Sequence, residues 1–356
     1  MSAYYFIYAL VLCGVPISLI DDAKIRRQCQ VLYFTFILTV LAIFAGLRSP
    51  SVDHDYLNYV DWFNSIAAGT AATGLLLRDP AFGLISWVVS GVGGKFLVVA
   101  LIYAVLAVLA LSYFAIAAVS NRWLTLYFYL LFCDYFIVGE MTEIRSMVAI
   151  PLMAISLYFA CSGDKKRSIG IYILGLTFHF SIIISLPILV LLLMGVQFRS
   201  RWWVIAFVPL SFVAIFFFNP IIEAMTGFYR ISEAANQGVP DNDLSRSSWT
   251  ALVHLLVIAA CLLWAWKRLS LHHRVATIFS GLGLSLLLIF ISNSELGFRF
   301  LALYEIYWLL LLIVLMEMLQ GYKRLLYCGA LCLLGFGLYN KSLQAVVPYV
   351  WQLASR

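Results

Sequence analysis

Residues 96–119 read FLVVALIYAVLAVLALSYFAIAAV and contain no charged side chain. At about 1.5 Å per residue, a helix of this length crosses the roughly 30 Å hydrocarbon core of a bilayer. The run does not alternate apolar and polar residues as a strand of a membrane barrel does. Because backbone amides inside a bilayer must be paired within the protein, the stretch predicts a membrane-spanning α-helix.

The whole 356-residue chain has the same character, with 64% hydrophobic and 11% charged residues. A water-soluble globule of this size cannot hide so much apolar surface. We therefore predict an all-α polytopic membrane protein, with about 11–12 transmembrane helices in one integral membrane domain over residues 1–356. The predicted spans are 3–20, 29–47, 96–119, 123–139, 146–161, 168–178, 180–198, 202–219, 249–266, 275–292, 301–318 and 325–339.

The segment 168–198 decides the orientation. As a helix it would be about 46 Å long, which is too long for one crossing and short for two. A compressed hairpin that reverses at His179 places most of the basic loop residues on one side, and this bias makes that side cytoplasmic. These residues are Lys24, Arg26, Arg27, Arg122, Lys165, Lys166, Arg167, Arg199, Arg201, Lys267, Arg268, Arg274, Lys323 and Arg324.

The outer side then receives two longer loops. Residues 48–95 form a first outer loop, and its apolar stretch from Pro80 is too short to span, so we expect a short interfacial helix there. Residues 220–248 have the Gly, Pro, Asn and Asp content of a lid-like loop. The seven cysteines lie within or beside predicted spans, so neither a disulfide framework nor a zinc site is indicated. We expect no cofactor and no nucleic-acid partner.

Several arginines lie on the predicted outer side, although most basic loop residues lie on the cytoplasmic side. Arginine binds a phosphate or pyrophosphate bidentately and does not lose its charge, so a group of arginines at one membrane face predicts an anionic ligand. The alternative is that each arginine extends to the interface and pairs with a neighbouring acid such as Glu143. The predicted pyrophosphate-binding residues are Arg48, Arg145 and Arg299, with Arg230 and Arg246 assisting.

The stretch AGLRSPSVDHDYLNYVDWF (45–63) places carboxylates beside aromatic rings. This combination suits a sugar, whose hydroxyls need acceptors and whose C–H faces pack on rings. The alternative is a hydrated loop with a helix-capping aspartate. An imidazole at His179, in apolar surroundings, is a functional candidate, against a neutral histidine bonded to a carbonyl. His179, Asp55 and Asp53 are therefore the candidate catalytic bases.

Four pieces of the chain occur in a recognisable order: GLRSPSVDHDYLNYVDWF (46–63), EIRSMVAIPLMAISLYFA (143–160), TFHFSIIISLPIL (177–189) and FRFLALYEIYWLLL (298–311). Together they resemble the EpsG-like and Wzy-like polysaccharide polymerases of bacteria. Two positions depart from the family's pattern: Asp53-His54-Asp55 stands where a glycine before the aspartate is commoner, and Ser146 stands where a glutamine often follows the arginine.

The resemblance implies a GT-C-like protein of the bacterial inner membrane. It would join oligosaccharide repeat units carried on undecaprenyl pyrophosphate at the periplasmic face, to form O-antigen or exopolysaccharide, without a metal. Tyr59, Glu143 and Tyr304 are the expected substrate contacts. A chain-length-regulating co-polymerase and membrane lipid are expected partners.

Three other functions stay open. A GT-C glycosyltransferase that uses a polyprenyl-phosphate sugar would bind Mg²⁺ or Mn²⁺ through Asp53 and Asp55, and chelation discriminates it. An O-antigen ligase would need lipid A core as acceptor. A lipid-linked sugar transporter or flippase should show charge at the bilayer midplane and two related halves, whereas the polar residues here gather at one face and no repeat is visible.

Overall fold

The computed structural model describes residues 2–52, 56–71, 79–137, 143–204, 206, 242–289 and 301–343, with the side chains of 51 and 242–250 excepted. The described residues form helices joined by turns. The chain divides into two compact units, Met1–Leu193 with Leu326–Arg356, and Met194–Leu325. Whether they act as one membrane domain stays a prediction.

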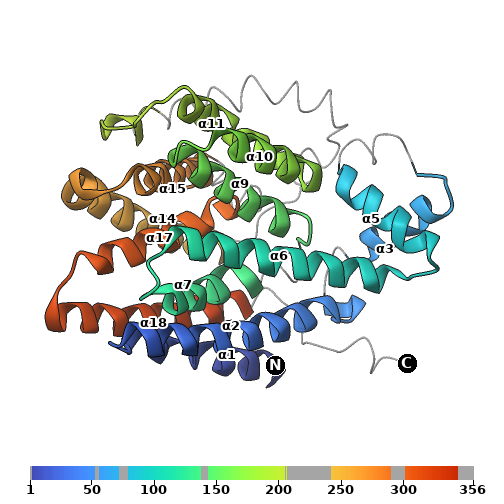
Figure 1. Cartoon of the computed structure of the whole chain (residues 1–356), viewed down its shortest axis with the longest axis horizontal. Helices are drawn as coiled ribbons and strands as arrows, with labels where there is room; N and C mark the ends of the chain where they lie inside the picture. Colours follow the sequence, from blue (N-terminus) through green and yellow to red (C-terminus); the bar gives the residue numbers. More distant parts are fainter. Residues whose placement is uncertain are drawn as a thin grey trace. The chain divides into compact units, whose positions relative to one another are not determined.

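The first unit contains long apolar helices and the short helices α3 and α5 (Figure 1). Its elements are α1 (Ser2–Leu12), η1 (Val15–Leu19), α2 (Ala23–Gly46), η2 (Pro50–Val52), α3 (Tyr56–Ala67), α5 (Pro80–Gly91), α6 (Phe96–Ala118), α7 (Leu124–Leu131), η3 (Phe132–Phe136), α9 (Ser146–Cys161), α10 (Lys165–Phe178), η4 (Phe180–Ser185), α11 (Leu186–Leu193) and most of α18 (Gly321–Leu343).

Helix α6 lies between α2 and α9 (Figure 1). Gly46, at the end of α2, lies so close to Leu101 near the start of α6 that a Cβ at Gly46 would be 2.6 Å from Leu101 Cδ1. Near the start of α2, Gln30 donates to the carbonyl of Asn121, which follows the end of α6. The two helices are therefore antiparallel. The unit therefore has two faces. We call the face with the ends Gly46, Phe96 and Ser146 the Arg145 face, and the opposite face, with the ends Ala23 and Ala118, the Lys24 face.

The helices α9 and α10 form a hairpin. The Ser156 hydroxyl donates to the Ser168 carbonyl at 2.8 Å, so α10 packs back along α9. Helix α10 ends at Phe178, His179 has an extended backbone, and η4 folds back so that the Tyr172 hydroxyl donates to the Ile182 carbonyl at 2.8 Å. The predicted break at His179 is confirmed.

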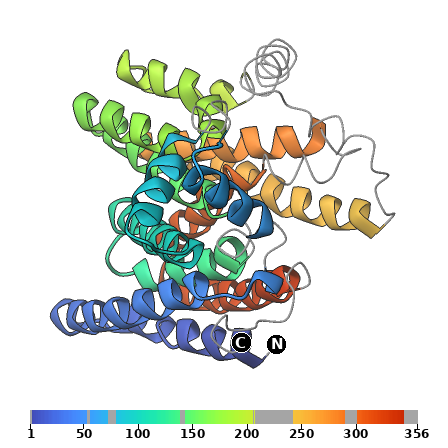
Figure 2. The ribbon, with the colours of Figure 1, turned by 90° about the vertical axis from the view of Figure 1, so that its right-hand side faces the viewer.

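Helices from both ends of the sequence meet in the first unit. Figure 2 shows α18 beside α1, although their residues are far apart in the chain. The Tyr129 hydroxyl of α7 donates to the Cys332 carbonyl at 2.8 Å, and the Ser342 hydroxyl donates to the Cys133 carbonyl at 3.2 Å. Helix α18 therefore completes the packing around α7.

The described part of the second unit is built on α14 (Asn242–Ala260), α15 (Leu271–Ile289) and α17 (Glu305–Glu317). Two short segments, η5 (Cys261–Ala265) and η6 (Trp266–Arg268), extend α14. The Phe279 ring of α15 stacks on Tyr304 at 5.4 Å and on Tyr307 at 5.1 Å between ring centroids. These aromatic contacts hold α15 against α17.

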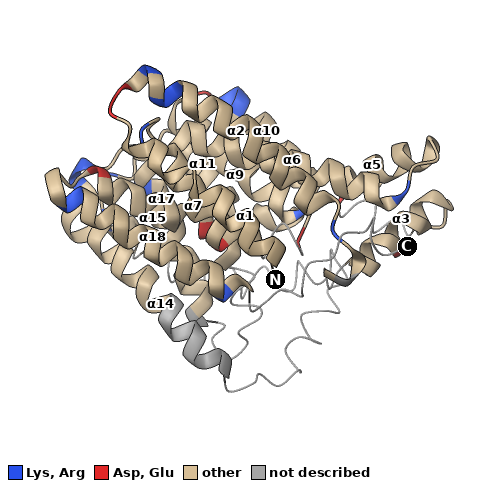
Figure 3. Ribbon diagram, turned by 90° about the horizontal axis from the view of Figure 1, so that it is seen from below, with Lys and Arg blue, Asp and Glu red and all other residues tan. Residues whose placement is uncertain are grey.

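The described residues contain four helical segments that are long and apolar enough to cross a membrane: Ser2–Leu19, Ala23–Gly46, Phe96–Ala118 and Ala251–Arg268. Shorter apolar helices include Leu124–Phe136 and Ser146–Cys161. Figure 3 shows how few charged residues lie along the described helices. The prediction of an all-α polytopic membrane protein is confirmed, and the short apolar stretch from Pro80 forms helix α5.

Candidate active site

Three charged or ionisable side chains from distant parts of the chain meet at the Arg145 face. The Arg145 guanidinium donates through Nη1 to Asp79 Oδ2 and forms an ion pair with that carboxylate. The other carboxylate oxygen, Asp79 Oδ1, lies 3.5 Å from His179 Nδ1. One carboxylate therefore bridges a guanidinium and an imidazole, and we call these three residues the Arg145 cluster.

The local sequence explains why each member is available. Asp79 precedes Pro80, and its backbone carbonyl accepts from Phe82 while its side chain makes no capping hydrogen bond to α5. A carboxylate at this position normally caps the helix, so here it is released for tertiary contacts. Arg145 directly precedes Ser146 at the start of α9. His179 lies at the break between α10 and η4.

Two aromatic side chains of α3 lie against the guanidinium. The Arg145 Cζ atom is 4.7 Å from the centroid of the Trp62 ring and 5.3 Å from that of Tyr59. A guanidinium within about 6 Å of an aromatic face is attracted by the ring quadrupole. The Tyr59 ring is buried and also packs near Phe82 of α5, so the wall is held by two helices. This arrangement limits the directions that Arg145 can take.

Burial differs across the Arg145 cluster. The side chain of Asp79 is 1% exposed, that of Arg145 is 11% and that of His179 is 23%. A buried carboxylate without a partner is very costly, so the cluster depends on the guanidinium. Burial lowers the pKa of Arg145, but Tyr59 and Asp79 raise it by more, and the net pKa is above its ordinary value. The guanidinium stays charged, and the Asp79 carboxylate is the most buried of the three groups.

Two other predicted site residues belong to the same face of the first unit. Arg48 is 1% exposed, and its Nη1 donates to the Ala45 carbonyl at 2.7 Å, at the end of α2. Glu143 accepts a hydrogen bond from the Ser146 hydroxyl at 2.9 Å, at the start of α9. The ion pair that the structure records for Arg145 is with Asp79, not with this neighbouring acid.

The remaining predicted residues lie in the second unit or outside the described part of the chain. Tyr304 belongs to the second unit, where it is buried against Phe279. Arg246 lies in α14, but its side chain is outside the described residues. Asp53, Asp55, Arg230 and Arg299 are also outside the described residues.

Sequence reasoning missed Asp79 as a site residue. An aspartate directly before a proline is typical of a helix start, so Asp79 is not among the predicted site residues. A useful signal was available in the short apolar helix that follows. A helix too short to span keeps its first residues close to the membrane surface, where the pyrophosphate-binding arginines are also expected.

The described residues contain no group of three or more His, Cys, Asp or Glu side chains that could hold a metal ion. The Asp53 and Asp55 pair lies outside this part of the chain. Within the described residues, the Arg145 cluster offers a fixed cation, a nitrogen base and an aromatic wall. These groups can bind an anionic leaving group, accept a proton and pack against a sugar ring.

The fold and the cluster define a polytopic membrane protein with a cationic, sugar-compatible site at one face. A model of the EpsG family matches residues 31–351, which include Tyr59, Asp79, Arg145 and His179. The chain belongs to the EpsG family, and the resemblance found in the sequence is confirmed. Membership indicates a membrane protein with a polysaccharide polymerase-type role, of the glycosyltransferase-like kind. No curated protein and no solved structure matches the chain.

Proposed function

We propose that the protein is a polymerase that joins undecaprenyl-pyrophosphate-linked oligosaccharide units into a longer polysaccharide. The observation that carries this proposal is the bridge that Asp79 makes between Arg145 and His179 beside Tyr59 and Trp62. A glycosyl transfer from a pyrophosphate needs a cation for the leaving group and a base for the acceptor. The Arg145 cluster supplies both, next to rings that suit a sugar.

The donor pyrophosphate binds to Arg145 in this proposal. A guanidinium forms two parallel hydrogen bonds to phosphate oxygens, and the contact grows stronger as negative charge develops on the leaving group. Trp62 and Tyr59 keep the guanidinium oriented while the pyrophosphate replaces the Asp79 carboxylate as its partner. Arg48, Arg299, Arg230 and Arg246 are the further candidates for the pyrophosphates of donor and acceptor.

His179 acts as the base. A hydroxyl of the acceptor saccharide attacks the anomeric carbon of the donor, the new glycosidic bond forms, and the bond to the pyrophosphate oxygen breaks. The pyrophosphate leaves with the electron pair, and the hydroxyl proton passes to His179 Nε2. Asp79 faces the other ring nitrogen and stabilises the imidazolium that results. Asp55 and Asp53 are the alternative bases.

The distribution of basic residues supports a periplasmic site in the bacterial inner membrane. At the Arg145 face, the described part of the first unit has Arg48, Lys95, Arg145 and Lys341. At the Lys24 face it has Lys24, Arg26, Arg27, Arg122, Lys165, Lys166 and Arg167. An excess of basic residues is typical of the cytoplasmic side, so we assign the Arg145 face to the periplasm.

The test is polymerisation by purified protein of a synthetic prenyl-pyrophosphate oligosaccharide, with the products resolved as a ladder on a gel. Arg145→Lys should abolish the ladder, because lysine keeps the charge but loses the bidentate geometry. Arg167→Lys is the matched control, because this side chain is 71% exposed at the Lys24 face. An intact ladder with Arg145→Lys would refute the assigned role of Arg145. A wild-type protein that makes no ladder would refute the polymerase itself.

A further inference from the structure

A hollow of about 850 Å³ opens at the Lys24 face of the first unit. It lies between the first turns of α2 and the turn at residues 120–123 that joins α6 to α7. Gln30 lines the hollow and donates to the Asn121 carbonyl. Because α6 separates this end from the Arg145 cluster by about 30 Å, the hollow is distinct from the candidate active site.

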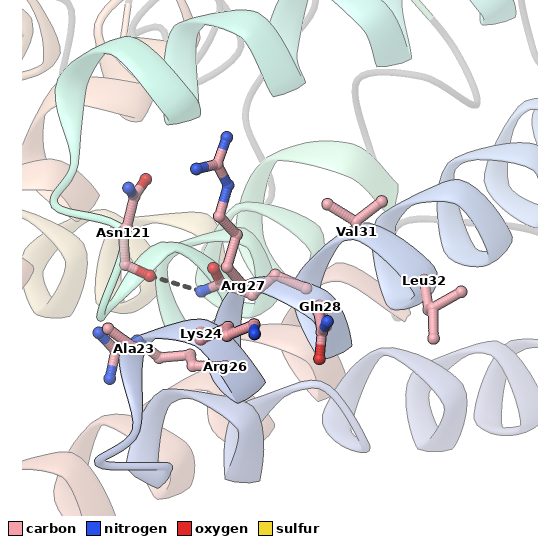
Figure 4. Close-up of a pocket in the computed structure, with 9 residues that line it drawn as sticks. Ala23, Lys24, Arg26, Arg27, Gln28, Val31, Leu32 and Asn121 are labelled. Atoms are coloured by element: carbon pink, nitrogen blue, oxygen red, sulfur yellow. Dashed lines mark hydrogen bonds between the residues drawn. The ribbon is translucent and has the colours of Figure 1, made fainter.

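The mouth of the hollow carries two available cations. Lys24 and Arg27 are exposed, and among the described residues neither forms an ion pair or a side-chain hydrogen bond. Arg26 differs, because its Nη1 donates to the Ile20 carbonyl at 2.6 Å and fixes the turn before α2. Figure 4 shows the Arg27 side chain on the side of α2 that faces Asn121.

The nearby carboxylates are already engaged. Asp22 accepts from the backbone amides of Lys24 and Ile25 at 2.8 and 2.9 Å and so caps α2. Asp21 pairs with Arg122 at 2.8 Å. The charges of Lys24 and Arg27 are therefore not matched by either acid, and the mouth favours an anion.

The hollow changes from cationic to apolar along α2. Lys24, Gln28, Leu32 and Phe36 are four residues apart and share one side of the helix. Leu32 is 74% exposed and Phe36 is 54% exposed. Leu32 lies about 12 Å further into the membrane than Lys24. A free phosphate would contact only the cations. An amphiphile with an anionic head and a hydrocarbon tail would contact both the cations and the apolar side chains of Leu32 and Phe36.

We infer that this hollow is a binding site for an anionic phospholipid of the leaflet at the Lys24 face. The phosphodiester lies between the Lys24 ammonium and the Arg27 guanidinium, and the Gln28 amide contacts the polar headgroup. One acyl chain runs along Leu32 and Phe36. Basic pockets between membrane helices are a known way to hold anionic headgroups, and each basic residue near the surface adds to the attraction. The bound lipid links α2 to the turn at residues 120–123.

The test is lipid binding to the full-length protein in detergent, followed by native mass spectrometry and by thermal unfolding. Phosphatidylglycerol should form adducts and raise the unfolding temperature, whereas phosphatidylcholine and inorganic phosphate should not. The double variant Lys24→Gln/Arg27→Gln should bind phosphatidylglycerol roughly thirtyfold more weakly. Lys166→Gln/Arg167→Gln, two exposed cations of the same face, is the matched control and should bind like the wild type.

Two results would overturn the inference. Equal phosphatidylglycerol binding by wild type and the Lys24/Arg27 double variant would show that the hollow is not the site. Equal stabilisation by inorganic phosphate would show a site for free anions and not for a lipid. Leu32→Asn separates these cases, because it should weaken lipid binding and leave the cations in place. None of these measurements uses polymerase activity, so their outcome is independent of the proposed function.

Discussion

Asp79 and Arg145 lie 66 residues apart in the sequence, and their side chains form a largely buried ion pair at one face of the first unit. The pair joins the start of α5 to the start of α9. A buried pair of this kind contributes little net stability, but removal of one partner leaves the other charge without compensation. The pair therefore makes the structure of the site sensitive to single substitutions.

Asp79→Asn should lower the free energy of unfolding by about 3 kcal/mol, because Arg145 loses its compensating charge. The same variant should lose the polysaccharide ladder, since His179 also loses the carboxylate beside Nδ1. Thermal unfolding in detergent and the ladder assay measure the two effects. Asp61→Asn is the control, because Asp61 is exposed on α3. Wild-type stability and a normal ladder with Asp79→Asn would contradict the assigned role.

His179→Gln should reduce the polymerisation rate by roughly a hundredfold or more, the usual contribution of a general base. Donor binding should stay near the wild-type level, because the proposed role of His179 is to accept the proton of the acceptor hydroxyl. If His179→Gln polymerises at the wild-type rate, the base is another group, and Asp55 and Asp53 become the first candidates.

Trp62→Ala should raise the KM for the donor several-fold, since a cation–π contact contributes about 0.5–2 kcal/mol. The Trp62 ring is the closer of the two rings to Arg145 Cζ, at 4.7 Å. Trp62→Phe keeps an aromatic face and should restore most of the affinity. Trp87→Ala, at a ring that is 65% exposed on α5, controls for the general loss of a tryptophan. Identical kinetics for Trp62→Ala and the wild type would exclude a role in holding Arg145.

Chelation with EDTA should leave the ladder unchanged, because the proposed reaction uses a guanidinium for the leaving group and needs no metal. The rival glycosyltransferase with a metal at Asp53 and Asp55 predicts the opposite result. Re-addition of Mg²⁺ or Mn²⁺ after chelation is the control. Activity that is lost with EDTA and restored by the cation would favour the rival.

Gly46→Val should destabilise the first unit by about 1–3 kcal/mol, because the close approach of α2 and α6 has no room for a side chain. A Cβ at Gly46 would lie 2.9 Å from the Leu101 Cα atom, which cannot move aside like the end of a flexible side chain. Gly337→Ala is the control, since a Cβ there meets nothing within 4 Å. Unfolding temperatures in detergent compare the two variants.

Much of the fold could be predicted from the sequence because bilayer thickness and hydrophobic length act locally. The predicted span 146–161 matches α9, and 96–119 matches α6 apart from its last residue. The reversal at His179 followed from the length of one apolar segment and the positions of basic residues. Helix α3 was not predicted, because its residues alternate between polar and aromatic and give no spanning signal.

The partners within the site could not be predicted in the same way. Arg145 has an acid two residues before it, Glu143, yet its ion pair is with Asp79. Such a choice depends on how α5 packs beside α6 and α10, which no local pattern encodes. Sequence analysis identified Arg145, His179 and Tyr59 as site candidates, and the structure brings these three together around Asp79, which is not among the predicted residues.

The hydrogen bonds that join α18 to α7 and η3 also constrain how the protein is made. The Tyr129 hydroxyl and the Cys133 carbonyl find their partners at Cys332 and Ser342, about two hundred residues later in the chain. Ribosomes deliver helices to the membrane in sequence order, so the elements from α1 to α11 are synthesised well before α18 exists. One side of α7 therefore stays open to lipid or to an insertion factor until the whole of the second unit has been synthesised.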